Sequence, residues 1–145
     1  MMRVQLLTPE MLAGVAEIER AVFSQPWSES ALQLLCGDTA FGFAVTEEAL
    51  PVAYGGMLTV LDEGQITNIA TLPAYRRRGL AAKVLEALLR EARARELAFV
   101  TLEVRESNAP AISLYEKFGF LTVGYRKGFY TGPVEAALVM QCNLD

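Results

Sequence analysis

Residues 66–82, with the sequence Ile-Thr-Asn-Ile-Ala-Thr-Leu-Pro-Ala-Tyr-Arg-Arg-Arg-Gly-Leu-Ala-Ala, predict a place where a strand ends and a helix begins. The β-branched and apolar residues up to Leu72 suit a buried strand, Pro73 stops it, and Gly79 opens the helix. A helix start leaves about four backbone N–H groups unpaired and carries about half a positive charge, so it attracts anions. Three neighbouring side chains add charge-assisted donors for phosphate oxygens: Arg76, Arg77 and Arg78. The junction therefore predicts a phosphate-binding site.

Two familiar phosphate-binding loops do not fit this junction. A Walker loop needs Gly-Lys-Ser/Thr at the helix start, whereas Gly79 is followed here by Leu80, Ala81 and Ala82. A dinucleotide-binding strand needs Gly-x-Gly-x-x-Gly, and the junction has a single glycine. What remains is Arg-x-x-Gly-x-Ala, from Arg76 to Ala81. Solvated loops also carry this pattern, so the flanking sequence is needed to distinguish a phosphate-binding site from a solvated loop.

The length of 145 residues predicts one domain, residues 1–145, that can bury a core without a disulfide or a metal. Cys36 and Cys142 lie far apart without metal-ligand spacing, so we expect two reduced core thiols and no bound metal. No apolar run approaches the ~18 residues that span a bilayer, and the first residues lack the apolar stretch of a signal peptide. We therefore expect a cytoplasmic protein without membrane contact, and a monomer.

The charge balance restricts the classes of partner. Thirteen basic and 17 acidic residues give a net charge of −4, which disfavours broad nucleic-acid binding and favours a cationic substrate. Histidine is absent, which removes the commonest general base and any Ser-His or Cys-His dyad. Proton transfer then falls to carboxylates, tyrosine or water.

The apolar pattern over the whole chain predicts an α/β domain with a mixed sheet. The predicted strands cover residues 4–7, 41–46, 52–61, 65–72, 99–104, 121–125 and 135–143. The predicted helices are one with the apolar stripe Met11, Val15, Ile18 and Val22, a short one ending at Gly37, a long one from Gly79 to about Arg95, and one from Asn108 to Gly119. We expect side-chain N-caps at Thr8, Ser28 and Asn108.

The connections predict the order of the strands. Short links make the early strands an antiparallel meander with a tight turn at residues 62–64. The long helix is a crossover, so the strand at 99–104 should run parallel to the strand at 65–72. The last two strands should pair as a hairpin.

A second block, residues 102–120, is more specific than the junction. Its sequence Leu-Glu-Val-Arg-Glu-Ser-Asn-Ala-Pro-Ala-Ile-Ser-Leu-Tyr-Glu-Lys-Phe-Gly-Phe resembles the L-E-V-R-x-S-N-x-x-A-I-x-L-Y-E-K-x-G-F signature of the RimI branch of the GNAT superfamily. Arg76 to Ala81 is similar to the Q/R-x-x-G-x-G/A loop of the same superfamily. The resemblance covers nearly the whole chain, including residues 26–29, 68–70, 75–80, 124–127 and 137–140.

The resemblance implies a GNAT fold and an enzyme that transfers an acetyl group from acetyl-CoA to the N-terminal α-amine of a protein. In the RimI branch the acceptor is a small-subunit ribosomal protein. The resemblance also implies which residues hold acetyl-CoA: backbone groups of Ile69, Ala70 and Thr71 for the acetyl-pantetheine arm, Arg77 to Ala82 for the pyrophosphate, and Asn108 further along the arm. Within it, Glu103 resembles the general base and Tyr115 the general acid.

The chain departs from the family pattern at the predicted acceptor groove. It has Gly128-Phe129-Tyr130 where family members often carry Asn-Tyr-Tyr, and Glu135-Ala136-Ala137 where they carry Glu-Asp-Ala. Tyr130 and Glu135 remain candidate acceptor-binding residues, since a carboxylate there suits a cationic peptide. Trp27 is either a core anchor or a wall of the substrate pocket.

The residues themselves can carry this chemistry. Strand alternation places Glu103 opposite Leu102 and Val104, near the carboxyl end of a parallel strand, where α/β sites usually open. Its carboxylate can accept a proton, directly or through water; the alternative is a solvated strand carboxylate. Tyr115 lies seven residues after Asn108, so both can face one groove, and a phenol can protonate a departing thiolate. The alternative for Tyr115 is packing in an apolar stripe.

Two other functions stay open at this stage. One is a GNAT acetyltransferase for a small free amine, which fits if Trp27 and Tyr130 close a small pocket. The other is a non-catalytic acyl-CoA sensor, which would keep Arg76 to Ala82 and show no turnover. An α-amine is the expected acceptor, because at neutral pH roughly a tenth of it is uncharged, against about one part in a few thousand for lysine.

Overall fold

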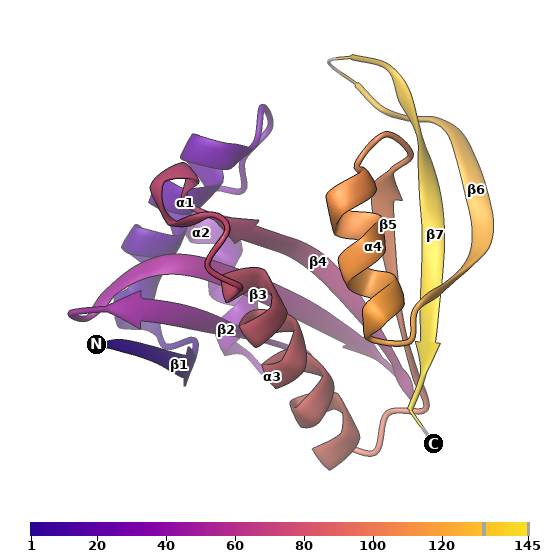
Figure 1. Cartoon of the computed structure of the whole chain (residues 1–145). Helices are drawn as coiled ribbons and strands as arrows, with labels where there is room; N and C mark the ends of the chain where they lie inside the picture. The colour runs from indigo at the N-terminus through magenta and orange to yellow at the C-terminus, as the bar shows by residue number, and fades with distance from the viewer. Residues whose placement is uncertain (132, 145) are drawn as a thin grey trace.

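The structure is a computed structural model that describes residues 1–131 and 133–144. Within these residues one sheet contains seven strands, which Figure 1 labels: β1 (Met2–Leu6), β2 (Ala40–Glu47), β3 (Leu50–Val60), β4 (Glu63–Thr71), β5 (Phe99–Arg105), β6 (Leu121–Tyr130) and β7 (Glu135–Asn143). The helices are α1 (Leu12–Val22), α2 (Glu29–Leu32), α3 (Leu80–Ala94) and α4 (Ala109–Lys117), with 3-10 turns η1 (Pro9–Met11), η2 (Gln33–Cys36) and η3 (Pro73–Tyr75). The α/β class is confirmed.

The sheet order is β1-β2-β3-β4-β5-β7-β6. Strands β2, β3 and β4 form the expected antiparallel meander, and α3 is the crossover that makes β5 parallel to β4. The predicted C-terminal hairpin is also confirmed, with β7 lying between β5 and β6. The mixed sheet therefore has the GNAT arrangement that the sequence predicts.

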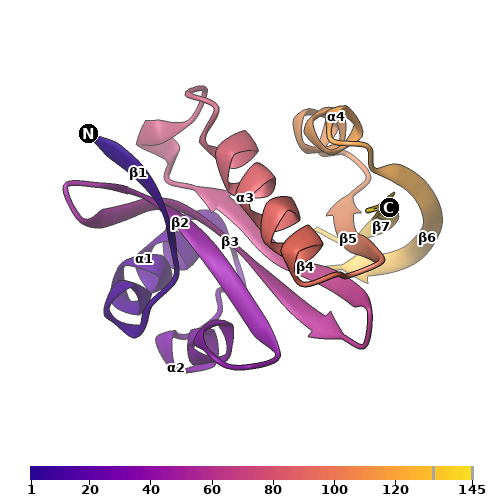
Figure 2. The ribbon, with the colours of Figure 1, turned by 90° about the horizontal axis from the view of Figure 1, so that it is seen from below.

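Helices cover both faces of the sheet (Figure 2). Helices α1 and α2 lie on one face, over a core that includes Val15, Ile18 and Leu32. Helices α3 and α4 lie on the other, and α3 buries Val84, Leu85 and Leu88 there while its charged residues face water. An apolar stripe at helical spacing gives each helix one buried side, which fixes the face it covers.

A bulge interrupts the pairing of β4 with β3. Gly55 pairs with Ile69 and Met57 pairs with Ile66, so Gly56 faces two residues of β4, Thr67 and Asn68. A bulge of this kind adds one residue to a strand and bends it. A Cβ added at Gly56 would lie 2.7 Å from Thr67 Oγ1, so the bulge needs a glycine opposite it.

The parallel pairing of β4 with β5 is short. It joins residues 63–65 of β4 to residues 99–101 of β5, and no later residue of β4 pairs with β5. From there the two strands separate, and β5 continues along β7 alone. One edge of β4 and one edge of β5 therefore have no ladder partner beyond this point.

Some local expectations were wrong. Thr8 makes no side-chain cap; only its backbone oxygen accepts, from the N–H of Met11, and η1 precedes α1. The tight turn lies at Leu61 and Asp62, because β3 ends at Val60 and β4 starts at Glu63. Strand β6 runs on to Tyr130, beyond the predicted residues 121–125, with irregular register before Tyr130.

Other local expectations are confirmed. Ser28 caps α2 by accepting from the N–H of Ala31, and Asn108 caps α4 by accepting from the N–H of Ala111. Gly119 has a φ of +94°, the left-handed conformation expected where α4 ends. Both cysteines are free thiols, and Cys142 is buried whereas Cys36 is only partly buried.

No helix within residues 1–131 and 133–144 is long and apolar enough to cross a membrane.

Candidate active site

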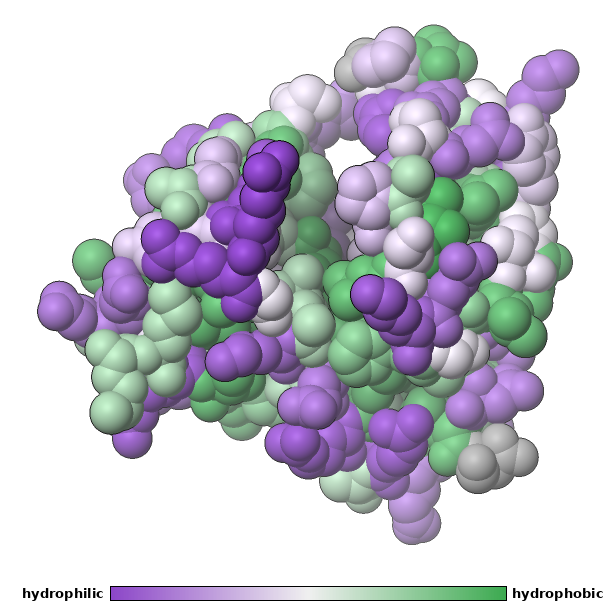
Figure 3. Space-filling model, viewed as in Figure 1, coloured by the Kyte–Doolittle hydropathy of each residue, from purple (hydrophilic) through white to green (hydrophobic). Residues whose placement is uncertain are grey.

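A pocket of about 650 Å³ opens where β4 and β5 separate. Figure 3 shows this hollow between the half that carries β1–β4 and the half that carries β5–β7. Four parts of the chain line it: the segment after α1 (Val22, Phe23, Ser24, Gln25, Trp27), the bulged part of β4 (Ile66, Thr67, Asn68, Ile69), β5 with α4 (Leu102, Glu103, Val104, Arg105, Asn108, Tyr115), and the end of β6 (Phe129, Tyr130, Thr131).

All the predicted site residues except Glu135 lie either in the pocket or along the path from β4 to the start of α3. Six of them line the pocket: Trp27, Ile69, Glu103, Asn108, Tyr115 and Tyr130. Ala70 and Thr71 continue β4 beyond it, and the remaining residues of the junction, Arg76 to Ala82, lie at the start of α3. The structure thus brings both candidate proton carriers together and leaves the candidate phosphate loop as a separate surface.

The loop before α3 has two residues in the left-handed backbone conformation and unpaired amides after them. Arg77 and Gly79 both have left-handed φ values, +66° and +73°. The first helical bond runs from Lys83 N to Gly79 O at 3.2 Å, so the amides of residues 80–82 precede the helical ladder. A Cβ at Gly79 would meet no protein atom within 4 Å, so the backbone there is open to a ligand.

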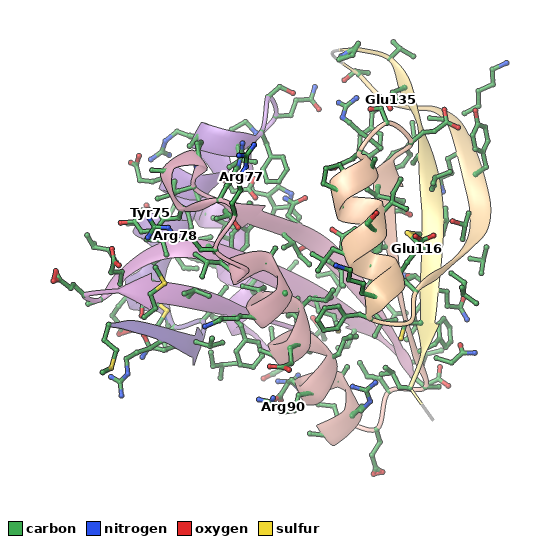
Figure 4. All side chains as sticks on the ribbon, in the orientation of Figure 1. Tyr75, Arg77, Arg78, Arg90, Glu116 and Glu135 are labelled. Carbon is green, nitrogen blue, oxygen red and sulfur yellow. The ribbon has the colours of Figure 1, made fainter. Side chains whose placement is uncertain are left out.

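The three arginines beside this loop are exposed, and within the described residues none pairs with a carboxylate. The guanidinium of Arg78 lies over the ring of Tyr75, 5.0 Å from its centroid. The Tyr75 hydroxyl donates to Glu47 at 2.8 Å, and this bond raises the pKa of Tyr75. Figure 4 shows Arg77 and Arg78 pointing in different directions from the start of α3. The loop keeps unpaired positive charge next to open amides.

Glu103 occupies the position that strand alternation predicts. Leu102 and Val104 are buried, whereas the Glu103 side chain is about one-third exposed, at 35%, and faces the pocket. Arg126 on β6 approaches the carboxylate, with 3.9 Å between Nη2 and Oε2. The carboxylate is therefore accessible to water, and it lies close enough to a substrate in the pocket to accept a proton.

Tyr115 reaches the same pocket from α4. Its side chain is buried beside Phe120, with ring centroids 5.9 Å apart. Burial, with a smaller effect from Tyr130, raises the pKa of Tyr115 to about 12. The phenol therefore keeps its proton near neutral pH and is available as a proton donor.

The far end of the pocket is organised by Arg105. Its guanidinium lies 4.5 Å from the ring centroid of Tyr130, and it donates to the carbonyl oxygens of Thr131 and Pro133 at 2.9 and 3.1 Å. Glu135 does not line the pocket: its carboxylate accepts from Arg105 at 3.2 Å and from the N–H of Ser107 at 2.6 Å. Hydrogen bonds from Ser107, and then Arg105, lower the pKa of Glu135. Figure 4 shows Glu135 beside the end of the hairpin.

The departures from the family pattern fall in different surroundings. Phe129 lines the pocket and packs edge-on against Tyr130, with centroids 5.0 Å apart. Gly128 has a φ of +66° and open space around its Cα, and Ala136 is buried in β7. Of these positions, Phe129 is the one that borders the pocket.

Sequence reasoning missed Glu19. Its side chain is fully buried and accepts hydrogen bonds from Trp27 N at 2.8 Å, from Asn68 Nδ2 at 2.9 Å and from the hydroxyl of Tyr54. A signal was present, because Glu19 falls inside the apolar stripe of α1, between Ile18 and Val22. A carboxylate in a buried stripe requires partners, and here they come from three separate elements.

Comparison with known proteins identifies the class of protein that this fold and pocket define. The acetyltransferase (GNAT) family matches residues 12–120, so the chain belongs to the GNAT family and is an N-acetyltransferase. Enzymes of this family use acetyl-CoA. A crystal structure of NAA60 from Arabidopsis thaliana in complex with acetyl-CoA shares the fold at 18% identity, with a TM-score of 0.90, and covers 99% of each chain.

Within the family the chain is similar to the ribosomal-protein-alanine N-acetyltransferases, the RimI branch. The [ribosomal protein bS18]-alanine N-acetyltransferase of Escherichia coli K12 is 37% identical over 131 residues, which are 89% of this chain and 88% of that protein. The enzyme of the same name from Haemophilus ducreyi is 37% identical over 88% of this chain and 90% of its own. The crystal structure of the E. coli enzyme has a TM-score of 0.92 at 35% identity and covers 100% and 95% of the two chains.

We expect Gly79→Asp to weaken acetyl-CoA binding by on the order of tenfold or more, because a carboxylate at this helix start repels phosphate and occupies the space beside the amides. Isothermal titration calorimetry with acetyl-CoA measures the change. Gly128→Asp is the matched control, since Gly128 has a similar φ and equally open surroundings. Equal affinity in the two variants would contradict the phosphate site.

Proposed function

We propose that this protein transfers the acetyl group of acetyl-CoA to the N-terminal α-amine of a protein, and that the acceptor is a small-subunit ribosomal protein such as bS18. The observation that carries the proposal is the meeting of Glu103 and Tyr115 in one pocket at the point where β4 and β5 separate. An acid and a base in one cleft are the groups that acyl transfer to an amine requires.

Acetyl-CoA binds along the separated edge of β4. Its pyrophosphate lies on the amides of residues 77–82, with Arg76, Arg77 and Arg78 adding charge. The pantetheine arm follows Ile69, Ala70 and Thr71, and Asn108 contacts the arm from the start of α4. This path is supported by the unpaired edge of β4 and by the open loop at Gly79. A backbone N–H of this edge polarises the thioester carbonyl.

The acceptor amine enters from the end of the pocket that Trp27 and Tyr130 border, with Glu135 beside it. Glu103 takes a proton from the amine through water as nitrogen bonds to the thioester carbon. The C–S bond then breaks, Tyr115 gives its proton to sulfur, and solvent reprotonates Tyr115. Since the pKa of Tyr115, about 12, exceeds that of a thiol, ~8.5, the phenol first acts as a hydrogen-bond donor to the developing thiolate.

The α-amine is the acceptor that this chemistry favours. Its pKa of about 8 leaves roughly a tenth of it uncharged near neutral pH, whereas a lysine side chain is almost entirely protonated. A chain without histidine has one exposed carboxylate in this pocket to remove the proton, so a less basic amine suits it. The 37% identical relatives, whose names give the alanine of bS18 as their acceptor, support the same choice.

Glu103→Gln and Tyr115→Phe should each fold and bind acetyl-CoA while kcat/KM falls by about 10²- to 10⁴-fold, because each variant keeps the shape and removes a proton carrier. Steady-state kinetics and calorimetry with acetyl-CoA separate turnover from binding. Phe120→Leu, beside Tyr115 but without a proton to give, is the control for packing. Losses smaller than about threefold in both variants would return these residues to packing roles.

The pH profile follows from the raised pKa of Tyr115. We expect kcat/KM to rise as the acceptor amine loses its proton near pH 8 and then to stay level to about pH 10, since the phenol keeps its proton well below pH 12. Initial rates with acetyl-CoA and a peptide from pH 6 to 10 test this. A falling limb below pH 10 that disappears in Tyr115→Phe would contradict the raised pKa of Tyr115.

Two matched peptides test the acceptor. One has a free N-terminal alanine and acetylated lysines, and the other has a blocked N-terminus and free lysines. We expect mass spectrometry to find acetylation of the first at a rate at least about tenfold higher, because of its larger uncharged fraction. Faster reaction of the second would exclude the α-amine. Activity on neither peptide, with activity on a polyamine, would support a small-amine acetyltransferase, and binding without any turnover would support an acyl-CoA sensor.

A further inference from the structure

Glu19 is an acidic side chain buried in the apolar core. It lies in the core between α1 and the sheet, near Val15 and Ile18, and none of its surface is exposed. In residues 1–131 and 133–144, no basic side chain lies within ion-pair distance of it. A carboxylate without a cation is costly to bury unless neutral donors satisfy its oxygens. The role of Glu19 therefore follows from the three groups that donate hydrogen bonds to it.

The donors belong to three elements, two of which line the pocket. Oε1 accepts from the backbone N–H of Trp27, in the segment between α1 and α2. Oε2 accepts from Asn68, inside the bulge of β4, and from the hydroxyl of Tyr54 on β3. Trp27 and Asn68 line the pocket, whereas Tyr54 is fully buried and lies outside it. One carboxylate thus joins two pocket walls that are 41 residues apart in the chain.

We propose that Glu19 is a positioning residue for the acceptor half of the site, and this rests on the proposed function. Its carboxylate sets the segment that carries Trp27 against the bulge that carries Asn68. The bulge in turn fixes the next residue, Ile69, where the pairing with β3 resumes. Glu19 touches no substrate, because its oxygens are sealed inside the core. It acts by holding the acceptor wall and the donor strand at a constant separation.

The geometry predicts different effects of two substitutions, Glu19→Gln and Tyr54→Phe, on the hydrogen bonds to the pocket walls. Glu19→Gln keeps the shape and leaves one acceptor oxygen for donors on two sides. If the amide nitrogen replaces Oε1, two donors face each other, because the backbone N–H of Trp27 cannot become an acceptor. If it replaces Oε2, the Tyr54 hydroxyl can turn and accept, but the Asn68 amide has to flip. Glu19→Gln should therefore loosen a pocket wall, whereas Tyr54→Phe should leave both pocket-side bonds intact.

Trp27 is the one tryptophan of the chain, so its fluorescence reports on the wall itself, without any assumption about activity. With excitation at 295 nm, we expect acrylamide to quench Glu19→Gln about twofold more strongly than wild type, because the segment opens more often. Tyr54→Phe should lower the melting temperature and leave the quenching unchanged. Equal quenching in wild type and Glu19→Gln, or an equal increase in both variants, would overturn the positioning role.

Kinetics give the second readout. For the peptide with a free N-terminal alanine, we expect Glu19→Gln to raise the acceptor KM about tenfold while the Kd of acetyl-CoA changes less than about twofold. Residues 76–82 share no bond with Glu19, and Ile69 keeps its own pairing with Gly55. Tyr54→Phe should keep the acceptor KM of wild type. An unchanged acceptor KM in Glu19→Gln would count against the role even if its melting temperature fell.

Two further results distinguish a failure of this inference from a failure of the proposed function. A wild-type enzyme inactive on the peptide would remove the proposed function, and the fluorescence comparison would still decide the role of Glu19. If Glu19→Gln does not fold, Asn68→Ala takes its place, because it removes one pocket-side donor and leaves the carboxylate. In Asn68→Ala the acrylamide quenching of Trp27 and the acceptor KM should both rise as expected for Glu19→Gln. If both keep their wild-type values, the proposal is overturned.

Discussion

The parallel pairing of β4 with β5 ends after Gln65 and Thr101, and the pocket exists because of this early separation. Continued pairing would join the edges of the two strands and leave no room between them. The bulge opposite Gly56 bends β4 just beyond the last paired residue, so the strand turns away where the pocket begins. An unpaired strand edge inside a protein is costly, and a ligand that accepts its hydrogen bonds offsets that cost. The early separation thus leaves one edge of each strand without a ladder partner beside the pocket.

The two halves around this opening have different roles in the proposed reaction. The half with α3 supplies a helix start with left-handed residues and unpaired arginines, which suits a phosphate group and needs no specific side-chain shape. The half with β5 and α4 supplies the side chains with protons to exchange. Burial of Tyr115 in the α4 core and exposure of Glu103 on β5 give one group that keeps its proton and one that water can reach. The chemistry of the pocket therefore depends on which side of each element faces solvent.

The sequence predicted what depends on neighbouring residues. The strand-helix junction, the caps at Ser28 and Asn108 and the alternation around Glu103 follow from local rules, and the structure has them. The Thr8 cap failed because a 3-10 turn took the place of the first helical turn. Contacts between distant segments could not be predicted: Arg105 with the end of the hairpin, the bulge opposite Gly56, and the donors to Glu19 all join residues more than seven positions apart. Of these, only Glu19 left a trace in the sequence, as an acid within an apolar stripe.

Arg105 holds the end of the β6–β7 hairpin mainly through carbonyl oxygens of the backbone, at Thr131 and Pro133. Every residue has a backbone carbonyl, so these two hydrogen bonds do not depend on the side chains at residues 131 and 133, whereas the contacts of Arg105 with Tyr130 and Glu135 do depend on side chains. Substitutions at residues 131 and 133 can therefore accumulate without loss of these bonds to β5. The tip lies beside the predicted acceptor entrance and apart from the start of α3. In the proposed function, substitutions in this part of the fold can therefore change acceptor preference while residues 76–82 stay the same.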